Sequence, residues 1–196
     1  MNRMRGTQVM NKKGRLFVIS APSGAGKGTV IKRILELRPE LSYSVSATTR
    51  PPREGETEGV SYSFVSRDVF IEMIERDEFF EYAEYVGEYY GTPKNPVYGC
   101  INKGTDVLLE IEVQGARQVM AIDPAAVSIF IVPPGVQELE RRLRGRKTES
   151  EDKLAARLDR ACQELEEKIH YDHIVINDDY SRAAEEIIAI IDRTKN

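Results

Sequence analysis

Residues 20–30 read SAPSGAGKGTV, with three glycines and one lysine between two apolar segments. The run RLFVIS (15–20) before the loop fits a buried strand, and an amphipathic helical pattern begins at Val30. Glycine lets backbone N–H groups turn inward, where a Cβ would obstruct them, and the N-terminus of the following helix favours an anion. This order of strand, glycine-rich loop and helix predicts a phosphate-binding loop, to which Lys27 adds a point charge.

The loop departs from the GxxxxGK[ST] pattern at two positions. Ala21 stands where the pattern begins with glycine, and Gly28 stands where a hydroxyl is usual, with Thr29 one residue later. A glycine-rich turn with a solvated lysine is the alternative interpretation, and the flanking strand and helix disfavour it. The GKGT ending resembles nucleoside monophosphate kinases more than GTPases.

Five short apolar runs are expected to form strands, because several are nearly continuous in apolar residues, as strands buried on both faces are. These runs are residues 15–20, 43–49, 106–113, 127–133 and 173–178. Helical spacing follows most of them, including residues 150–171 and the last segment around Ile187. The alternation predicts an α/β fold of the P-loop three-layer type, with a five-stranded parallel sheet between helices. Two prolines and two glycines weaken any helix over residues 92–104.

Two stretches do not fit this alternation. Residues 50–92 are rich in Tyr, Glu and Gly, and they are expected to form a small mixed-β insertion with a helix over 67–78 packed against it. Residues 138–158 are dense in Arg and Glu and are expected to form a helical lid. The chain is therefore divided into a flexible tail, a core, the insertion and the lid. The tail covers 1–14, and the core covers 15–49, 93–137 and 159–196.

Composition limits the possible partners and the compartment. The 196-residue chain has a net charge of −4, so it is not a basic nucleic-acid binder, and no nucleic acid is expected as a partner. No apolar run approaches the ~20 residues of a membrane helix, so no membrane partner is expected. Cys100 and Cys162 lie outside any CxxC spacing, which favours a reducing, cytoplasmic location over a zinc or disulfide site. The sequence does not settle the oligomeric state.

A second anion site is indicated by Arg50 and Arg53, which lie three residues apart around two prolines. The prolines fix φ near −65°, so the arginines project from a stiff turn. Two guanidinium groups with tyrosine hydroxyls nearby suit one dianionic phosphate. Taken alone, the same residues also fit a surface turn with solvated charges.

The chain resembles the guanylate kinases in several motifs that occur in the family order. They are APSGAGKGT (21–29), SVSATTRPPREGE (44–56), SYSFVS (61–66), EFFEYAEYVGEYYGT (78–92), LLEIEVQGA (108–116), RLRGRKTESEDKLAARL (142–158) and HIVIND (173–178). The resemblance implies a P-loop core, a GMP-binding insertion and a lid, and transfer of the γ-phosphoryl group of ATP to GMP or dGMP.

The resemblance also implies roles for individual residues. ATP would be bound by Ala21, Pro22, Ser23, Gly24, Ala25, Gly26, Lys27, Gly28 and Thr29. The GMP phosphate would be held by Arg50, Arg53, Tyr62 and Tyr90, and guanine would be faced by Ser46, Glu81, Thr92 and Glu112. Lys27, Arg142, Arg146 and Arg157 would act on the transferring group as catalytic residues.

Three positions depart from the family pattern. Glu112 and Ser61 stand where Asp is usual, and Lys147 replaces a frequent Gly or Asn. The exact contact of Glu112 with the base is therefore open. None of these changes removes a group that the chemistry needs.

The expected chemistry needs no general base, because the acceptor is a phosphate oxygen that is already ionised at neutral pH. Catalysis would come from alignment and charge stabilisation. Mg²⁺ would accompany ATP, held by the Thr29 hydroxyl, water and phosphate oxygens.

Three alternatives compete with this interpretation. An adenylate kinase would leave Glu81 and Glu112 without a purpose at the base. A GTPase would read guanine with NKxD, but Asn102-Lys103-Gly104-Thr105 has threonine in place of the aspartate. A binding module without activity would tend to lose Lys27 and the lid arginines, which are present here.

Overall fold

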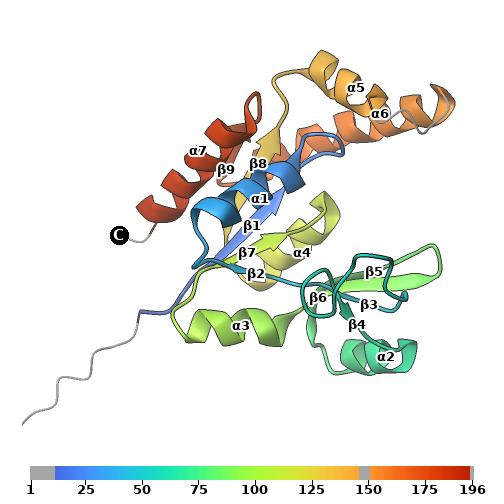
Figure 1. Ribbon diagram of the computed structural model, residues 1–196, viewed down its shortest axis with the longest axis vertical. Coiled ribbons are helices and arrows are strands. Elements are labelled where there is room, and N and C mark those ends of the chain that lie inside the picture. Colours follow the sequence, from blue (N-terminus) through green and yellow to red (C-terminus); the bar gives the residue numbers. More distant parts are fainter. Residues whose placement is uncertain (1–11, 146–150, 195–196) are drawn as a thin grey trace, which may run out of the picture.

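The computed structural model describes residues 12–145 and 151–194, which form an α/β fold with two sheets (Figure 1). The larger sheet is parallel, with the strand order β2-β7-β1-β8-β9. Its strands are β1 (Leu16–Ser20), β2 (Ser42–Tyr43), β7 (Val107–Glu110), β8 (Val127–Val132) and β9 (His173–Ile176). The predicted five-stranded parallel sheet is confirmed over the described residues.

Helices cover both faces of the parallel sheet, which makes three layers (Figure 1). One face packs against α1 (Lys27–Leu37) and α7 (Tyr180–Arg193), and the other against α3 (Lys94–Asn102) and α4 (Val113–Ile122). In β1, Phe17 belongs to the first core and Val18 to the second. Since successive side chains of a strand point to opposite faces, burial on both faces explains the continuous apolar run.

A second, mixed sheet has the strand order β4-β3-β6-β5. Its strands are β3 (Ala47–Thr48), β4 (Ser63–Phe64), β5 (Phe79–Tyr85) and β6 (Glu88–Pro93). β3 pairs with β4 in parallel, whereas β6 is antiparallel to both β3 and β5. The helix predicted over 67–78 forms as α2 (Arg67–Glu75), capped by the Ser66 side chain, which accepts from the backbone N–H of Val69.

Three sequence expectations need correction. The run 43–49 is not one strand, because Ser42–Tyr43 pairs with β7 while Ala47–Thr48 joins the mixed sheet. The run 106–113 is too long, because α4 already begins at Val113. Residues 94–102 are helical, since Pro93 precedes α3 and Pro96 lies in its first turn, where backbone N–H groups have no helical partner.

Two helices from the predicted lid pack on each other. They are α5 (Val136–Arg144) and α6 (Glu151–Glu166), and a 3₁₀ turn (η1, Glu167–His170) follows. Leu139 and Leu143 of α5 form a small core with Leu154 and Ala161 of α6. This small core is distinct from the two cores of the parallel sheet. In the part of the chain that the structure describes, no helix is long and apolar enough to cross a membrane.

We expect Phe70→Ala to destabilise the mixed sheet strongly. The Phe70 ring is 0% exposed and stacks on Phe79 and Tyr89, with ring centroids at 4.4 Å and 5.3 Å. Removing a buried ring costs about 3–5 kcal/mol in the free energy of unfolding, because a cavity remains. Denaturant unfolding measures it, with Val69→Ala on the exposed side of the same helix as the control, expected within about 0.5 kcal/mol of wild type. Equal effects of the two substitutions would contradict the packing argument.

Candidate active site

The phosphate loop (residues 21–29) joins β1 to α1 at the carboxyl end of the parallel sheet, where open α/β sheets bind ligands. Gly24 and Gly26 have φ angles of 90° and 88°, the left-handed region that glycine tolerates best. A Cβ on Gly26 would also lie 2.6 Å from the side-chain amide nitrogen of Asn177. That amide donates to the Ala25 carbonyl at 2.7 Å. The loop is thereby held in a shape that only glycine at position 26 permits.

Lys27 is the first residue of α1, and its ammonium group is nearly buried, with 11% of the side chain exposed. Its Nζ donates to the Ile111 carbonyl at 2.8 Å and lies 3.6 Å from Glu112 Oε1 and 4.0 Å from Glu110 Oε1. The Glu110 carboxylate also accepts from the Tyr43 hydroxyl at 3.0 Å. Burial, together with Glu110, raises the pKa of Tyr43. Tyr43 thus stays a neutral donor that fixes Glu110 beside the lysine.

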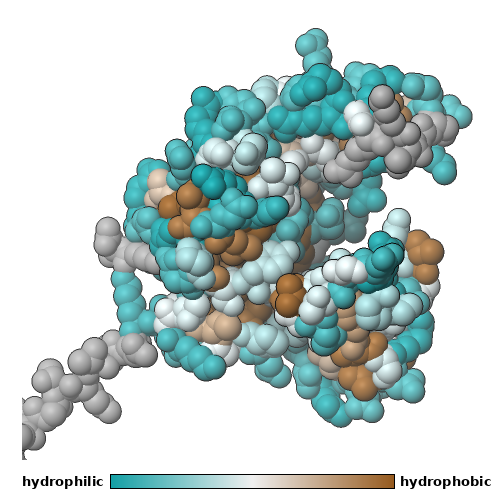
Figure 2. Space-filling model, in the orientation of Figure 1, coloured by the Kyte–Doolittle hydropathy of each residue, from teal (hydrophilic) through white to brown (hydrophobic). Residues whose placement is uncertain are grey.

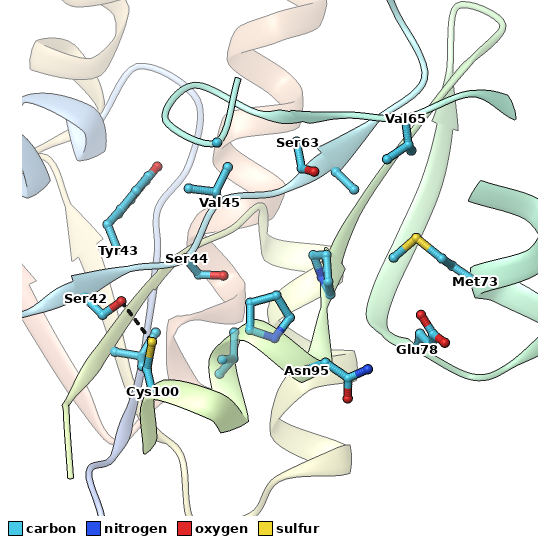
Figure 3. Close-up of a pocket in the computed structure, with 16 residues that line it drawn as sticks. Ser42, Tyr43, Ser44, Val45, Ser63, Val65, Met73, Glu78, Asn95 and Cys100 are labelled. Carbon is cyan, nitrogen blue, oxygen red and sulfur yellow. Dashed lines mark hydrogen bonds between the residues drawn. The ribbon is translucent and has the colours of Figure 1, made fainter. Parts of the chain in front are cut away.

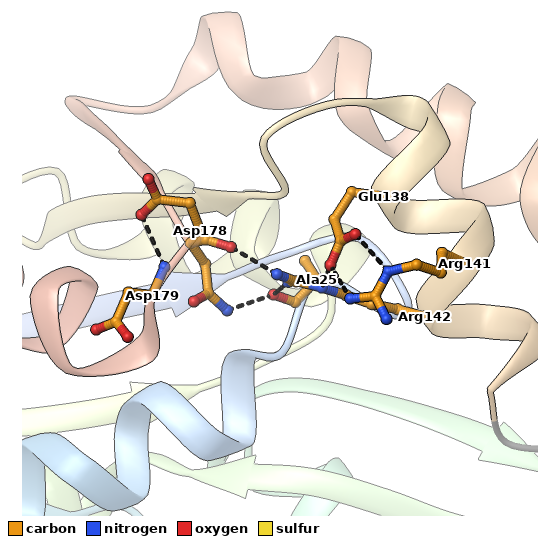
Figure 4. Close-up of polar contacts among 7 residues, drawn as sticks. Ala25, Glu138, Arg141, Arg142, Asp178 and Asp179 are labelled. Atoms are coloured by element: carbon orange, nitrogen blue, oxygen red, sulfur yellow. Dashed lines mark hydrogen bonds and ion pairs between the residues drawn. The ribbon is translucent and has the colours of Figure 1, made fainter.

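Arg142 of α5 reaches the phosphate loop (Figure 4). Its Nη1 donates to the Ala25 carbonyl at 3.1 Å and its Nη2 to the Asn177 carbonyl at 2.9 Å. Its Nε donates to Glu138 Oε1 at 2.7 Å. Hydrogen bonds from Arg141, and then from Arg142, lower the pKa of Glu138 to about 2, so this carboxylate stays ionised and holds the guanidinium over the loop.

A second lid helix contacts the same loop. Arg157 of α6 donates from Nη2 to the Ser23 hydroxyl at 3.1 Å, and Glu164 accepts from the Ser23 backbone N–H at 3.1 Å. Arg142 and Arg157 therefore converge on the phosphate loop from two helices. Arg146, the third expected lid arginine, lies outside the described residues, as does Lys147.

The arginine–tyrosine cluster (Arg50, Tyr62 and Tyr90) lies on the mixed sheet. The Arg50 guanidinium is 4.9 Å from the centre of the Tyr62 ring, and the Tyr62 and Tyr90 rings are 6.1 Å apart. The Glu56 carboxylate, and to a lesser degree Tyr90, raises the pKa of Arg50. Arg53 is exposed at the edge of this cluster.

Glu81 and Thr92 face each other across β5 and β6, and the Thr92 hydroxyl donates to Glu81 Oε1 at 2.8 Å. Burial raises the pKa of Glu81, partly offset by the bonds from Thr92. A Cβ on Gly115 would lie 3.1 Å from Glu81 Cγ, so the first turn of α4 passes directly against the Glu81 side chain.

Two further expected base contacts, Ser46 and Glu112, come from other segments than Glu81 and Thr92. Ser46 is half-buried just before β3, and its carbonyl accepts from the Ser63 backbone N–H at 2.9 Å. Glu112 is the N-cap residue of α4, with 71% of its side chain exposed, and it lies beside Lys27. Its exact partner at the base therefore stays a prediction.

The surface between the lid helices and the mixed sheet is hollowed (Figure 2). A separate pocket of about 480 Å³ lies where the mixed sheet meets α3 (Figure 3). Ser63 and Val65 line this pocket, whereas Tyr62 and Phe64, which alternate with them along the chain, do not. Alternation places the pocket on the opposite face of the mixed sheet from Tyr62, away from the arginine–tyrosine cluster.

Sequence reasoning missed four polar residues that shape the site: Glu56, Glu110, Glu164 and Asn177. Two of them carried a local signal, because Glu110 ends the apolar strand β7 and Asn177 directly follows β9, both at the carboxyl edge of the parallel sheet. Glu164 carried no local sequence signal, because it lies in an acidic helix and contacts Ser23 only through tertiary packing.

Comparison with known proteins places this geometry in one family. The guanylate kinase family model matches residues 13–194. The chain is 48% identical to guanylate kinase of Clostridioides difficile, over 94% of this chain and 90% of the relative. It is 50% identical to guanylate kinase of Rubrobacter xylanophilus, over 93% and 95%. The crystal structure of guanylate kinase from Anaplasma phagocytophilum superposes with a TM-score of 0.73 at 35% identity, covering 93% of this chain and 87% of that one. The chain therefore belongs to the guanylate kinase family, whose members phosphorylate GMP with ATP.

Proposed function

We propose that this chain transfers the γ-phosphoryl group of ATP to GMP or dGMP by the site just described. The observation that carries the proposal is the first turn of α4, which lies against both halves of the site. Glu112 at its start is 3.6 Å from Lys27 Nζ, and Gly115 one turn later abuts Glu81. A donor phosphate on Lys27 and an acceptor base on Glu81 would thus be held on one short rigid segment.

The donor half consists of residues 21–29. Inward backbone N–H groups and the N-terminus of α1 bind the phosphates of ATP in this proposal. Lys27 leaves the Ile111 carbonyl, or shares it, to follow the transferred group. The lysine is poised between Glu110 and Glu112, so its position is set before the nucleotide binds.

The acceptor half holds GMP at both ends. Arg50, Arg53, Tyr62 and Tyr90 bind its phosphate, and the aromatic rings shield the Arg50 charge from water. Glu81 accepts from the two adjacent donors of the guanine edge, while Thr92 holds the carboxylate in place. Ser46 and Glu112 supplement the base contacts. None of these groups needs the ribose 2′-hydroxyl, so dGMP is also an acceptor.

The residues at the loop fit a magnesium ion that arrives with ATP. Mg²⁺ keeps several waters and takes one or two protein oxygens besides phosphate oxygens. Thr29 is exposed on the first turn of α1, and Glu110 Oε1 would lie 3.9 Å from a Cβ on Gly28. Thr29, directly, and Glu110, through water, are the proposed protein oxygens. The ion would supply charge neutralisation between the β- and γ-phosphates.

The protein's own contribution is alignment and positive charge. The acceptor phosphate oxygen is already ionised, so no side chain has to remove a proton. Arg142 and Arg157 are held at Ala25 and Ser23, where they would meet charge that develops on the transferring group. Arg146 is proposed to join them. Closure of the lid helices would exclude water, the competing acceptor.

A coupled assay of ADP release tests the proposed function. Wild-type chain is given MgATP with GMP, dGMP, AMP or no acceptor. We expect rapid ADP release with GMP and dGMP and slow release with AMP or without acceptor. Equal rates with AMP and GMP would contradict the reading of guanine, and no transfer to any acceptor would favour a binding module.

The acceptor role of Arg53 gives a further prediction. We expect Arg53→Ala to raise the KM for GMP roughly tenfold or more, as for a lost charged hydrogen bond, with the KM for ATP unchanged. Steady-state kinetics with each nucleotide varied measures it. Arg76→Ala, at the exposed end of α2, is the control for loss of a positive charge in the helix beside the mixed sheet. A similar rise in both KM values would argue against a contact with the acceptor phosphate.

A further inference from the structure

Glu56 makes a close set of contacts in the turn that carries the two acceptor-side arginines. Its Oε1 accepts from Arg50 Nη2 and its Oε2 from Arg50 Nη1, both at 2.6 Å. Its Oε2 also accepts from the Arg53 backbone N–H at 2.8 Å. The Glu56 backbone N–H in turn donates to the Arg53 carbonyl at 3.0 Å. One carboxylate therefore ties the Arg50 side chain to the backbone of Arg53.

Burial makes this ion pair a requirement of the fold. Arg50 is 8% exposed, and its guanidinium carbon lies 4.9 Å from the centre of the Tyr62 ring and 5.8 Å from that of the Phe64 ring. A buried guanidinium without an anionic partner is costly, and the acceptor phosphate is present only part of the time. Glu56 supplies the permanent counter-charge.

The fork geometry of Arg50 leaves room for a second anion. A guanidinium has five N–H donors. Glu56 takes one from Nη1 and one from Nη2, and the Pro51 carbonyl takes the other Nη1 donor at 3.0 Å. The two other donors, on Nε and Nη2, form the side edge of the group, and the further hydrogen-bond partner of this guanidinium is Tyr90, itself a proposed ligand of the acceptor phosphate. That edge has the spacing for two oxygens of a phosphate.

We propose that Glu56 is a positioning residue that holds Arg50 and Arg53 as a preformed pair, so that the side edge of Arg50 receives the acceptor phosphate. This inference rests on the proposed function. Glu56 remains in place when the nucleotide binds, because the Arg53 backbone anchors it independently of the Arg50 side chain. The carboxylate also stays ionised in any neutral assay, since the Arg50 hydrogen bonds lower the pKa of Glu56 to about 2.

Charge and position predict opposite results when Glu56 is neutralised. By charge alone, removing an anion near a dianionic phosphate would tighten binding. By position, the loss frees Arg50 and the turn, and a phosphate then has to order both. We expect the loss of positioning to outweigh the loss of repulsion, since a small misplacement of groups that contact the substrate can lower activity roughly 10²-fold.

Calorimetry with GMP and with guanosine distinguishes the effect of charge from the effect of position. We expect Glu56→Gln to weaken GMP roughly 10- to 100-fold and to leave guanosine unchanged. The KM for GMP should rise with little change in the KM for ATP. Glu56→Asp keeps the charge but is one methylene shorter, so it should also weaken GMP. Glu54→Gln, exposed on the same turn, is the matched control for removal of a charge and should bind GMP as wild type does.

Tighter GMP binding by Glu56→Gln would overturn the proposal and identify Glu56 as a competitor of the phosphate. Unchanged GMP affinity in both Glu56 variants, or an equal loss for guanosine, would overturn it as well. Should Glu56→Gln fail to fold by circular dichroism, Glu56→Asp carries the same test. Absence of GMP phosphorylation by the wild type is a different result, because it refutes the proposed function itself.

Discussion

Lys27→Ala is expected to lower kcat by roughly 10³-fold or more while the affinity for GMP stays near that of wild type. The ammonium group is the cation at the end of the phosphate loop, fixed at 2.8 Å from the Ile111 carbonyl. A preorganised positive group that meets developing charge is worth roughly 10²–10⁵ in rate in comparable sites. Its loss also leaves Glu110 and Glu112 facing the nucleotide phosphates without a cation between them.

Single-turnover and steady-state kinetics measure this effect, and calorimetry with GMP checks that the acceptor half is intact. Lys32→Ala is the matched control, because Lys32 is an exposed lysine on the same helix. We expect that variant to keep wild-type kcat. Retention of most of the activity in a folded Lys27→Ala protein would refute the phosphate-loop assignment.

Glu81→Gln is expected to lower kcat/KM for GMP by roughly 10²-fold or more, as for a lost charged hydrogen-bond partner worth about 1.5–3 kcal/mol plus part of the pairing geometry. Guanine presents two adjacent donors, N1–H and the 2-amino group, and a carboxylate accepts from both. Adenine has a bare acceptor at N1 and no donor at C2, so it would leave the half-buried carboxylate with no donor besides the Thr92 hydroxyl. A site of this kind rejects the wrong substrate by ~10⁴ or more.

The rate with AMP should stay low but not fall in proportion, so the GMP:AMP ratio should shrink. Steady-state kinetics with both acceptors measures the ratio, and circular dichroism confirms folding. Glu84→Gln on the same strand, with half of its side chain exposed, is the control and should keep the wild-type ratio. An unchanged ratio for Glu81→Gln would mean that Glu112 or the backbone reads the base.

The pH dependence of kcat/KM in the wild type and in Glu81→Gln tests whether the ionised form of Glu81 binds the base. Burial raises the pKa of Glu81, so protonation begins to remove its acceptor at a higher pH than for an exposed carboxyl. We expect kcat/KM for GMP to fall as the pH drops toward that pKa in the wild type. Glu81→Gln should lack this limb and keep only the titration of the substrate phosphate near pH 6.

The sequence by itself determined the core of the fold and the donor loop. Both depend on local information: side chains alternate with period two in strands and 3.6 in helices, and glycine at positions 24 and 26 permits φ angles that other residues avoid. The bounds of β1, β8 and β9 were therefore predictable within a residue or two. The family resemblance then implied an acceptor half, in which the structure brings Arg50, Tyr62 and Tyr90 together and pairs Glu81 with Thr92.

Local patterns failed where distant partners choose the outcome. The run 43–49 has strand character throughout. Ser42–Tyr43 nevertheless pairs with β7 in the parallel sheet, whereas Ala47–Thr48 pairs with β6 and β4 in the mixed sheet. The prolines that argued against helix 94–102 lie before α3 and in its first turn, where they cost little.

Only the tertiary structure decided how the charges are paired. From the sequence, Glu56 is one acid among many in a polar turn, and Glu164 is one acid in a charged helix. The role of Glu56 depends on the way its turn folds back onto Arg50, six residues earlier, and the role of Glu164 on a contact with Ser23, 141 residues away. A hydrogen-bonded ion pair needs its nitrogen and oxygen within about 4 Å, so the pairing follows from the packed fold and not from residue type or spacing.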